Sequence, residues 1–267
     1  MKKWIFAILL TALALSCVGQ KDDPVPEPEP EPDPELPGGG NEEGGAFYRR
    51  SLILEFTGTW CVNCPKMENA VKEAQTQRPG RIVSVGVHCL TADKMALMPL
   101  SNDLITRFGV KAYPSVVTDL DKESLVTVAS AELLLAQCDR LLEGRPESAG
   151  ISIQSKIEGG RAEVSVEAKL VRAGDYSLHV LLLEDGVVAA QVGAASDYVH
   201  NNVLRAWTDS EAFAGRKEGD VIGSTVSFDA AEGMKVVAFV CRNGIVDNVT
   251  GCKTSENAGY EYEITTE

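Results

Sequence analysis

Two cysteines separated by two residues, Cys61 and Cys64, form the motif with the clearest chemistry in this sequence. They lie between an apolar, β-prone run at residues 51–56 and a polar, helix-prone run at residues 67–77. At such a strand-to-helix junction, free backbone N–H groups and the helix dipole stabilise a thiolate on the first cysteine. The motif alone fits a redox pair, half of a zinc site or a structural disulfide. No second CxxC or CxxH completes a zinc site, so we expect no metal.

Four further residues stand at characteristic distances from this pair. Trp60 directly precedes the first cysteine, and Glu55 stands six positions before it. Tyr113 and Pro114 follow about fifty positions later, in the run Phe-Gly-Val-Lys-Ala-Tyr-Pro-Ser. Together with the cysteines, these residues make the segment 46–146 resemble the thioredoxins.

The thioredoxin resemblance implies a role for each of these residues. The roles are attacking thiolate for Cys61, resolving thiol for Cys64, proton relay for Glu55, and substrate platform for Pro114, Tyr113 and Trp60. It also implies a cis bond before Pro114, facing the disulfide, although cis is found in only about 5–6% of X-Pro bonds. A trans proline that opens an edge strand is the alternative. Val62 and Asn63 replace the Gly-Pro of typical thioredoxins, which leaves the redox direction open.

The elements around these residues are predicted from local patterns. Residues 81–89 alternate and are rich in valine, as expected of a central strand. Residues 115–120 and 123–128 are predicted to form a hairpin, and Ser130 is placed to cap a helix that runs to Glu143. These elements favour an α/β domain.

The remaining sequence is dominated by strand and turn signals. Strands are predicted at residues 151–157, 162–171, 176–184, 223–228 and 234–241, with turn residues between several of them. Repeated hairpin signals of this kind are typical of a β-sandwich. We therefore predict an α/β thioredoxin-like domain followed by an all-β immunoglobulin-like sandwich domain.

Two cysteines in this second part are candidates for a structural disulfide. In an oxidising compartment Cys241 and Cys252 could pair. A tight turn between them would place Cys241 opposite Val246, so the bond requires curvature of the chain. The pairing of Cys89 and Cys138 is left open as well.

A second resemblance covers the whole chain. Residues 57–65 and 197–207, together with the predicted domains, resemble the twenty-eight-kilodalton outer-membrane-protein family of Bacteroidota. The resemblance implies a lipid-anchored outer-membrane protein, and it implies no substrate. For His200 and Arg205, a packed loop and a binding site remain alternatives.

The amino terminus has the features of an export signal. Lys2 and Lys3 precede an apolar run at residues 4–15, about half of the roughly 20 residues that a spanning helix needs. The segment that ends at Cys17 resembles a bacterial lipoprotein signal, which implies that Cys17 is acylated and anchors the protein in a lipid membrane. Ordinary signal cleavage is the alternative. Residues 20–23, Gln-Lys-Asp-Asp, resemble the acidic tag of surface-exposed Bacteroidota lipoproteins.

A proline-rich acidic segment separates this signal from the predicted domains. Residues 24–37 alternate proline with acidic residues, which favours an extended polyproline II chain of about 40 Å. The predicted organisation has four parts: a lipoprotein signal peptide at 1–16, an acidic Pro/Gly-rich tether at 17–45, a thioredoxin-like domain at 46–146, and a β-sandwich domain at 147–267.

The net charge of the chain narrows the class of molecule that the protein could bind. The chain has 25 basic and 39 acidic residues, a formal net charge of −14, so nucleic acid is excluded as a partner. We predict thiol-disulfide exchange on protein substrates, without an external cofactor, by a protein at the cell surface or facing the periplasm. The alternative is a non-enzymatic surface lipoprotein in which the CxxC is a structural disulfide. Such a protein would bind a protein or glycan, or dock on another outer-membrane protein such as a transporter.

Overall fold

The computed structural model describes residues 45–208 and 211–264. The predicted signal peptide, the lipidation residue Cys17 and residues 17–44 of the predicted tether lie outside the described residues. Across the described part of the chain, no helix has both the length and the apolar character that crossing a bilayer requires.

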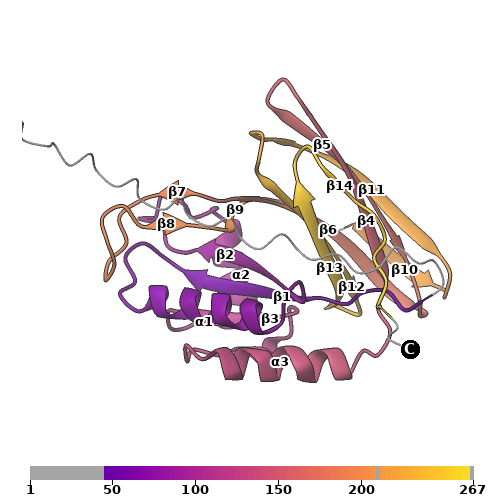
Figure 1. Ribbon diagram of the computed structural model, residues 1–267, viewed down its shortest axis with the longest axis horizontal. Coiled ribbons are helices and arrows are strands. Elements are labelled where there is room, and N and C mark those ends of the chain that lie inside the picture. The colour runs from indigo at the N-terminus through magenta and orange to yellow at the C-terminus, as the bar shows by residue number, and fades with distance from the viewer. Residues whose placement is uncertain (1–44, 209–210, 265–267) are drawn as a thin grey trace, which may run out of the picture. The chain divides into compact units, whose positions relative to one another are not determined.

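The first elements alternate between strands and helices (Figure 1). In chain order they are β1 (Ser51–Thr57), α1 (Cys64–Gln77), β2 (Ile82–His88), α2 (Leu100–Phe108), β3 (Ser115–Thr118), a 3₁₀ turn at Lys122–Ser124, and α3 (Ala131–Glu143).

The elements that follow are all strands within the described residues. They are β4 (Gly150–Glu158), β5 (Arg161–Lys169), β6 (Gly174–Glu184), β7 (Val187–Val188), β8 (Val199–His200), β9 (Val203–Trp207), β10 (Glu211–Arg216), β11 (Val221–Asp229), β12 (Lys235–Arg242), β13 (Ile245–Lys253) and β14 (Asn257–Ala258).

One mixed sheet takes strands from both parts of the chain. Over the described ranges it has eight strands, in the order β13-β12-β6-β9-β2-β1-β3, with β10 pairing to β6. The two parts join where β9 runs parallel to β2, with Val203 opposite Gly86. A separate antiparallel sheet has the order β11-β5-β4-β14, and β7 pairs with β8.

The predicted fold class is therefore wrong. A thioredoxin-like α/β domain followed by an immunoglobulin-like sandwich would keep its strands in separate sheets, whereas β6, β9, β12 and β13 extend the sheet of β1 and β2. Strands also far outnumber helices among the described elements. The physical reason is that local alternation predicts a strand but carries no information about its pairing partner.

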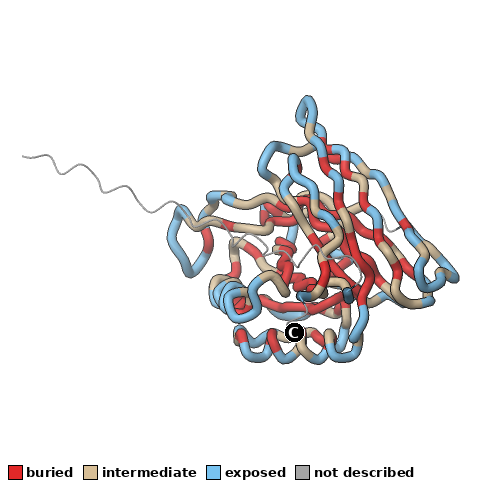
Figure 2. Tube along the Cα trace, turned by 45° about the vertical axis from the view of Figure 1, so that its right-hand side comes forward, coloured by how far each residue is buried: buried red, intermediate tan, exposed pale blue. Residues whose placement is uncertain are grey.

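The joined sheet has an apolar face that the two parts share. Alternate residues of β1, including Leu54 and Phe56, pack with Phe108 of α2 and with Phe239 of β12 and Val249 of β13. Further cores lie between the two larger sheets, and between α1, α3 and the opposite face of β1. Figure 1 shows α1 and α3 on one side of β1 and β3. Figure 2 shows that burial is concentrated along the strands, while helix surfaces remain exposed.

Of the elements predicted around β3, the helix cap at Ser130 is present, whereas the hairpin forms only in part. Ser130 caps α3 as expected, since its hydroxyl accepts a hydrogen bond from the Leu133 N–H at 3.3 Å. The predicted hairpin over residues 115–128 is reduced to β3 and a single bridge between Val116 and Val126. Asp121 explains the difference, because its carboxylate accepts from the Glu123 N–H at 3.0 Å and starts a 3₁₀ turn where a second strand was expected.

Candidate functional site

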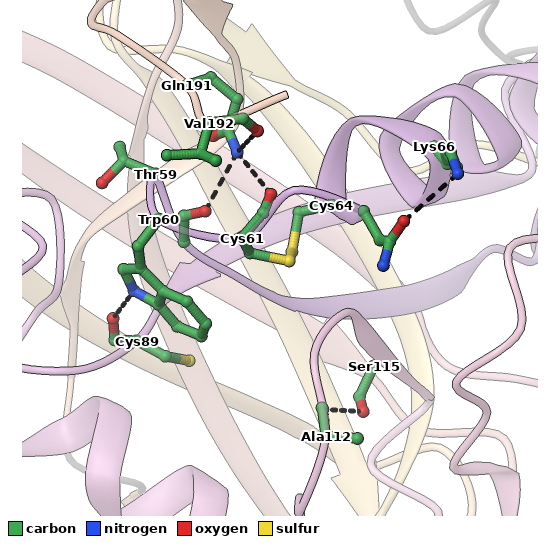
Figure 3. The surroundings of a disulfide bond; sticks show 12 residues. Thr59, Trp60, Cys61, Cys64, Lys66, Cys89, Ala112, Ser115, Gln191 and Val192 are labelled. Carbon is green, nitrogen blue, oxygen red and sulfur yellow. Dashed lines mark hydrogen bonds between the residues drawn. A yellow bond between two sulfur atoms is a disulfide. The ribbon is translucent and has the colours of Figure 1, made fainter. Parts of the chain in front are cut away.

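A disulfide between Cys61 and Cys64 lies where β1 leads into α1 (Figure 3). The intervening loop turns at Gly58, whose carbonyl accepts from the Cys61 N–H at 2.9 Å. Cys64 is the first residue of α1, and Pro65 follows in the first helical turn, where a proline costs no helical hydrogen bond. The Cα atoms of the two cysteines are 5.5 Å apart. Cys61 is 5% exposed and Cys64 is 2% exposed, so Cys61 is the more accessible of the two.

Two aromatic residues lie together beside this loop. The rings of Trp60 and Tyr113 meet edge to face with their centroids 5.0 Å apart. The Trp60 indole N–H donates to the carbonyl of Cys89 at 3.1 Å, which fixes the ring. The Tyr113–Pro114 peptide bond is cis, Tyr113 is half-buried and Pro114 is buried. Burial raises the pKa of Tyr113 to about 12, so its hydroxyl remains neutral.

Glu55 is a buried carboxyl on the face of β1 that packs against α1. Its side chain is 7% exposed, and its Oε1 has no hydrogen-bond partner among the described residues. Burial raises the pKa of Glu55 to about 8, repulsion from Glu68 adds to this rise, and Lys72 partly opposes it. Cys64 and Glu68 stand four positions apart, and so lie on one face of α1. The carboxyl of Glu55 therefore lies under the first turns of the helix that carries the resolving cysteine.

Glu68, which repels the Glu55 carboxyl, also contacts Tyr198 from a later part of the chain. It accepts a hydrogen bond from the Tyr198 hydroxyl at 2.5 Å and forms an ion pair with Lys72 at 2.8 Å. Burial, and then the contact with Glu68, raise the pKa of Tyr198. The Tyr198 ring also packs edge to face on His200, with centroids 4.9 Å apart.

His200 belongs to the same buried polar layer. It is 5% exposed, its ring lies 5.3 Å from that of His88, and its Nε2 has no partner within residues 45–208 and 211–264. Burial, and then the nearby His88, lower the pKa of His200. Arg205, by contrast, forms an ion pair with Glu184 at 2.6 Å on β6.

Asp93 holds the start of the disulfide loop. Its Oδ2 accepts from the Thr59 N–H at 2.8 Å and hydrogen-bonds the Nδ1 of His88 at 2.9 Å. Burial alone would raise the pKa of Asp93, but the hydrogen bonds from His88 and Thr59 outweigh it and lower the value to about 2. Asp93 is thus a carboxylate at neutral pH, and sequence reasoning missed it because nothing in the local pattern relates it to Thr59.

The remaining cysteines of the described residues are free thiols. Cys241 and Cys252 are not bonded to each other, because they face opposite sides of the sheet and pack in different cores. Cys241 lies opposite Val246, whereas Cys252 lies opposite Val236. Burial raises the pKa of both thiols to about 12, as it does for Cys89 and Cys138, which leaves them poor nucleophiles. Across the described part of the chain, no group of three or more His, Cys, Asp or Glu side chains is placed to hold a metal.

The structure brings most of the predicted site residues together. Cys61 and Cys64 form the disulfide, Trp60 and Tyr113 contact each other beside it, and Glu55 lies beneath α1. A residue that the sequence did not suggest, Gln191, also contacts this loop: its side-chain amide donates to the Cys61 carbonyl at 2.8 Å. Gln191 stands among small and apolar loop residues, and no signal in the sequence could have identified it.

Comparisons with known proteins yield structural similarity only. HBP35 of Porphyromonas gingivalis, a Bacteroidota protein, is similar with a TM-score of 0.66 and 17% identity, over 84% of this chain and 82% of that chain. A protein of Agrobacterium tumefaciens is similar with a TM-score of 0.53 and 14% identity, over 77% of this chain and 95% of that chain. No family model and no curated protein matches. These similarities show the fold alone, and membership of the twenty-eight-kilodalton family stays a prediction.

Proposed function

We propose that this protein exchanges thiols and disulfides with polypeptide substrates through Cys61 and Cys64. The observation that carries the proposal is a closed disulfide at the start of α1 above a buried carboxyl, Glu55, whose pKa is raised to about 8. A disulfide at a helix start is chemically useful, because free N–H groups stabilise a thiolate released there. A carboxyl with this pKa is protonated at neutral pH and can supply a proton.

The reaction transfers two electrons from a substrate dithiol to the protein. A substrate thiolate attacks Sγ of Cys61, the bond between the cysteines breaks, and Cys64 leaves as a thiolate. A second substrate thiolate then attacks the substrate sulfur of the mixed disulfide, and Cys61 leaves. The substrate gains a disulfide, and the protein gains two thiols. Cys61 is the expected point of attack because it is more exposed than Cys64.

Glu55 has the role of proton donor in this proposal. When Cys64 leaves, its charge develops in a buried setting, where an unpaired anion is costly. Transfer of the Glu55 proton to Cys64 neutralises that sulfur and moves the negative charge to a carboxylate near Lys72. The reverse transfer reactivates Cys64 when the protein is reoxidised.

A second candidate function is favoured by the low exposure of both cysteines. A disulfide whose residues are 5% and 2% exposed is also what a permanent structural link would show. In that case the protein is a binding or accessory lipoprotein, and its disulfide does not turn over.

The two candidates are separated by measuring how fast the purified full chain oxidises a peptide that contains two cysteines. Exchange predicts that the wild-type protein reacts much faster than oxidised glutathione, and that Cys61→Ser falls to the uncatalysed rate. Cys252→Ser is the matched control, because it removes a thiol of a different core and should retain the wild-type rate. A wild-type rate no higher than that of oxidised glutathione would establish the structural alternative.

Anchoring to the outer membrane through Cys17 is part of the same proposal. Its support is the sequence alone: an apolar run that ends in a cysteine, followed by an acidic tether. Cys17→Ala should move the protein from the membrane fraction to the soluble fraction of lysed cells, and an unchanged distribution would contradict acylation.

A further inference from the structure

A short segment between β7 and β8 lies against the disulfide loop. This segment, residues Gln191, Val192 and Gly193, is called the strap below. The Val192 N–H donates to the Thr59 carbonyl at 2.8 Å, and the Gln191 side chain is directed at the loop from the same side. Figure 3 shows Gln191 and Val192 over the backbone of the loop, with the sulfur atoms pointing away from Gln191.

The Gln191 amide contacts carbonyl groups on both sides of the turn. Its Nε2 lies 2.8 Å from the Cys61 oxygen and 3.3 Å from the Gly58 oxygen. Gln191 is only 5% exposed, so these bonds form away from water. The same turn is closed by the hydrogen bond from the Cys61 N–H to Gly58. One nitrogen bonded to both carbonyls therefore fixes the shape of the turn that carries Cys61, the cysteine that the substrate is proposed to attack.

Gly193 allows the strap to approach the residue between the cysteines. Its φ is +85°, a conformation that favours glycine. A Cβ at this position would lie 2.7 Å from the Val62 carbonyl oxygen and 2.8 Å from Val62 Cγ2. The close approach is therefore possible only with glycine, and it joins the strap to the loop at a second point, independent of the Gln191 amide.

We propose that the strap is a clamp that stabilises the Cys61–Cys64 disulfide and lowers its reduction potential. Its contacts fit the loop in its closed form. Reduction breaks the S–S bond, forms two thiols and lets the sulfurs separate, so the turn at Gly58 and Cys61 relaxes and the fit weakens. Thermodynamic reciprocity adds a consequence: if the strap favours the disulfide, the disulfide favours the docked strap by the same factor. Reduction thus loosens a segment whose residues lie about 130 positions along the chain from the cysteines.

This inference rests on the reversible disulfide of the proposed function, but its test measures an equilibrium rather than catalysis. The full chain is equilibrated with mixtures of reduced and oxidised dithiothreitol, which supply two electrons and two protons as the dithiol becomes a cyclic disulfide. Alkylation and peptide mass spectrometry then give the fraction of Cys61 and Cys64 that is reduced. A slow enzyme or an inactive one still yields this potential, so failure of the exchange proposal and failure of the clamp are distinguishable.

Gln191→Ala should destabilise the disulfide about tenfold, because it removes hydrogen bonds made out of contact with water, and that factor equals a potential about 30 mV less negative. Gly193→Ala should shift the potential in the same direction, since it displaces the strap without removing a donor. Gln75→Ala is the matched control: its amide donates to Ser84 Oγ at 3.3 Å and touches no residue of the loop. Wild-type potentials in both strap variants, or an equal shift in Gln75→Ala, would overturn the clamp.

Hydrogen exchange on the wild-type protein provides a test that depends on no variant. The Val192 N–H bonds to Thr59 in the disulfide form, so it should exchange at least several-fold faster after reduction. The Val117 amide, in the buried strand β3, is the internal reference and should be unchanged. Equal exchange of Val192 in the oxidised and reduced protein would overturn the coupling between the strap and the disulfide.

Discussion

The two faces of β1 and β2 differ sharply in composition, although the same strands form both. One face presents Leu52, Leu54, Phe56, Val85 and Val87, which are fully buried in the apolar core shared with α2, β12 and β13. The opposite face is apolar near α3 and becomes polar toward the disulfide.

That polar region contains most of the buried titratable groups near the site. Its buried members are Glu55, His88, Asp93 and His200, and the half-buried Glu68 and Tyr198 adjoin them. Because side chains alternate along a strand, Glu55 is held in place by the packing of its neighbours Leu54 and Phe56 on the other face. One face thus supplies stability and thereby keeps titratable groups buried or half-buried on the other.

The largest expected effect comes from breaking the apolar face. Leu54→Ala removes a side chain with no exposed surface and should lower the free energy of unfolding by about 2–5 kcal/mol. The reduction potential of Cys61 and Cys64 should stay at its wild-type value, because the loop contacts remain. Denaturant unfolding and dithiothreitol equilibration measure the two quantities. If Leu54→Ala kept the wild-type unfolding free energy but shifted the reduction potential of Cys61 and Cys64, the apolar face would not be the one that supplies stability.

A smaller effect is expected from the carboxylate that holds the loop. Asp93→Asn should cost about 2 kcal/mol of unfolding free energy at pH 7, because the hydrogen bonds that Asp93 accepts from Thr59 and His88 lose the negative charge that strengthens them.

The pH dependence of this effect follows from the pKa of Asp93, which is lowered to about 2. Its stabilisation is fully present above the usual value of 3.8 and is lost as pH falls toward 2. The difference between Asp93→Asn and wild type should therefore shrink in acid. Asp103→Asn, on the exposed side of α2, is the control, and a pH-independent difference for Asp93→Asn would contradict the assignment.

The buried carboxyl of Glu55 should act in the opposite direction with pH. Because its pKa is raised from 4.5 to about 8, its contribution to stability is fully present below pH 4.5 and declines as pH rises toward 8. The decline is at most about 1.4 kcal/mol per pH unit. Glu55→Gln should remove it, so unfolding curves at pH 5 and pH 8 should differ less in the variant than in wild type. An identical pH dependence in both proteins would show that Glu55 is ionised throughout.

The fold could be predicted only as far as local patterns reach. The alternation and apolar runs located β1, β2, α3 and the hairpin of β4 and β5, because each depends on neighbours a few residues apart. The pairing of β2 with β9 joins Gly86 to Val203, more than a hundred residues away, and no local pattern specifies it. The prediction of two domains with separate sheets is therefore wrong, because this pairing joins them.

The candidate site was likewise predictable only where its residues lie close together in the sequence. Cys61, Cys64, Trp60 and Glu55 lie within ten residues, so their spacing in the sequence made them candidates. Gln191 and Asp93 reach the loop through tertiary contacts, and neither carries a motif. The sequence also could not predict whether Glu55 and Asp93 are neutral or ionised. Their pKa values shift in opposite directions, because Asp93 accepts several hydrogen bonds whereas Glu55 Oε1 accepts none among the described residues.

The most direct test of the central claim compares the two cysteines one at a time. Cys64→Ser and Cys61→Ser, each in the full chain, are incubated with a cysteine peptide whose sulfur carries a glutathione disulfide, and the labelled residue is identified by mass spectrometry. We expect Cys61, which is buried but slightly more exposed than Cys64, to form the mixed disulfide in Cys64→Ser faster than Cys64 does in Cys61→Ser. Equal labelling of the two cysteines, or no labelling of Cys61, would contradict an exchange function for this pair.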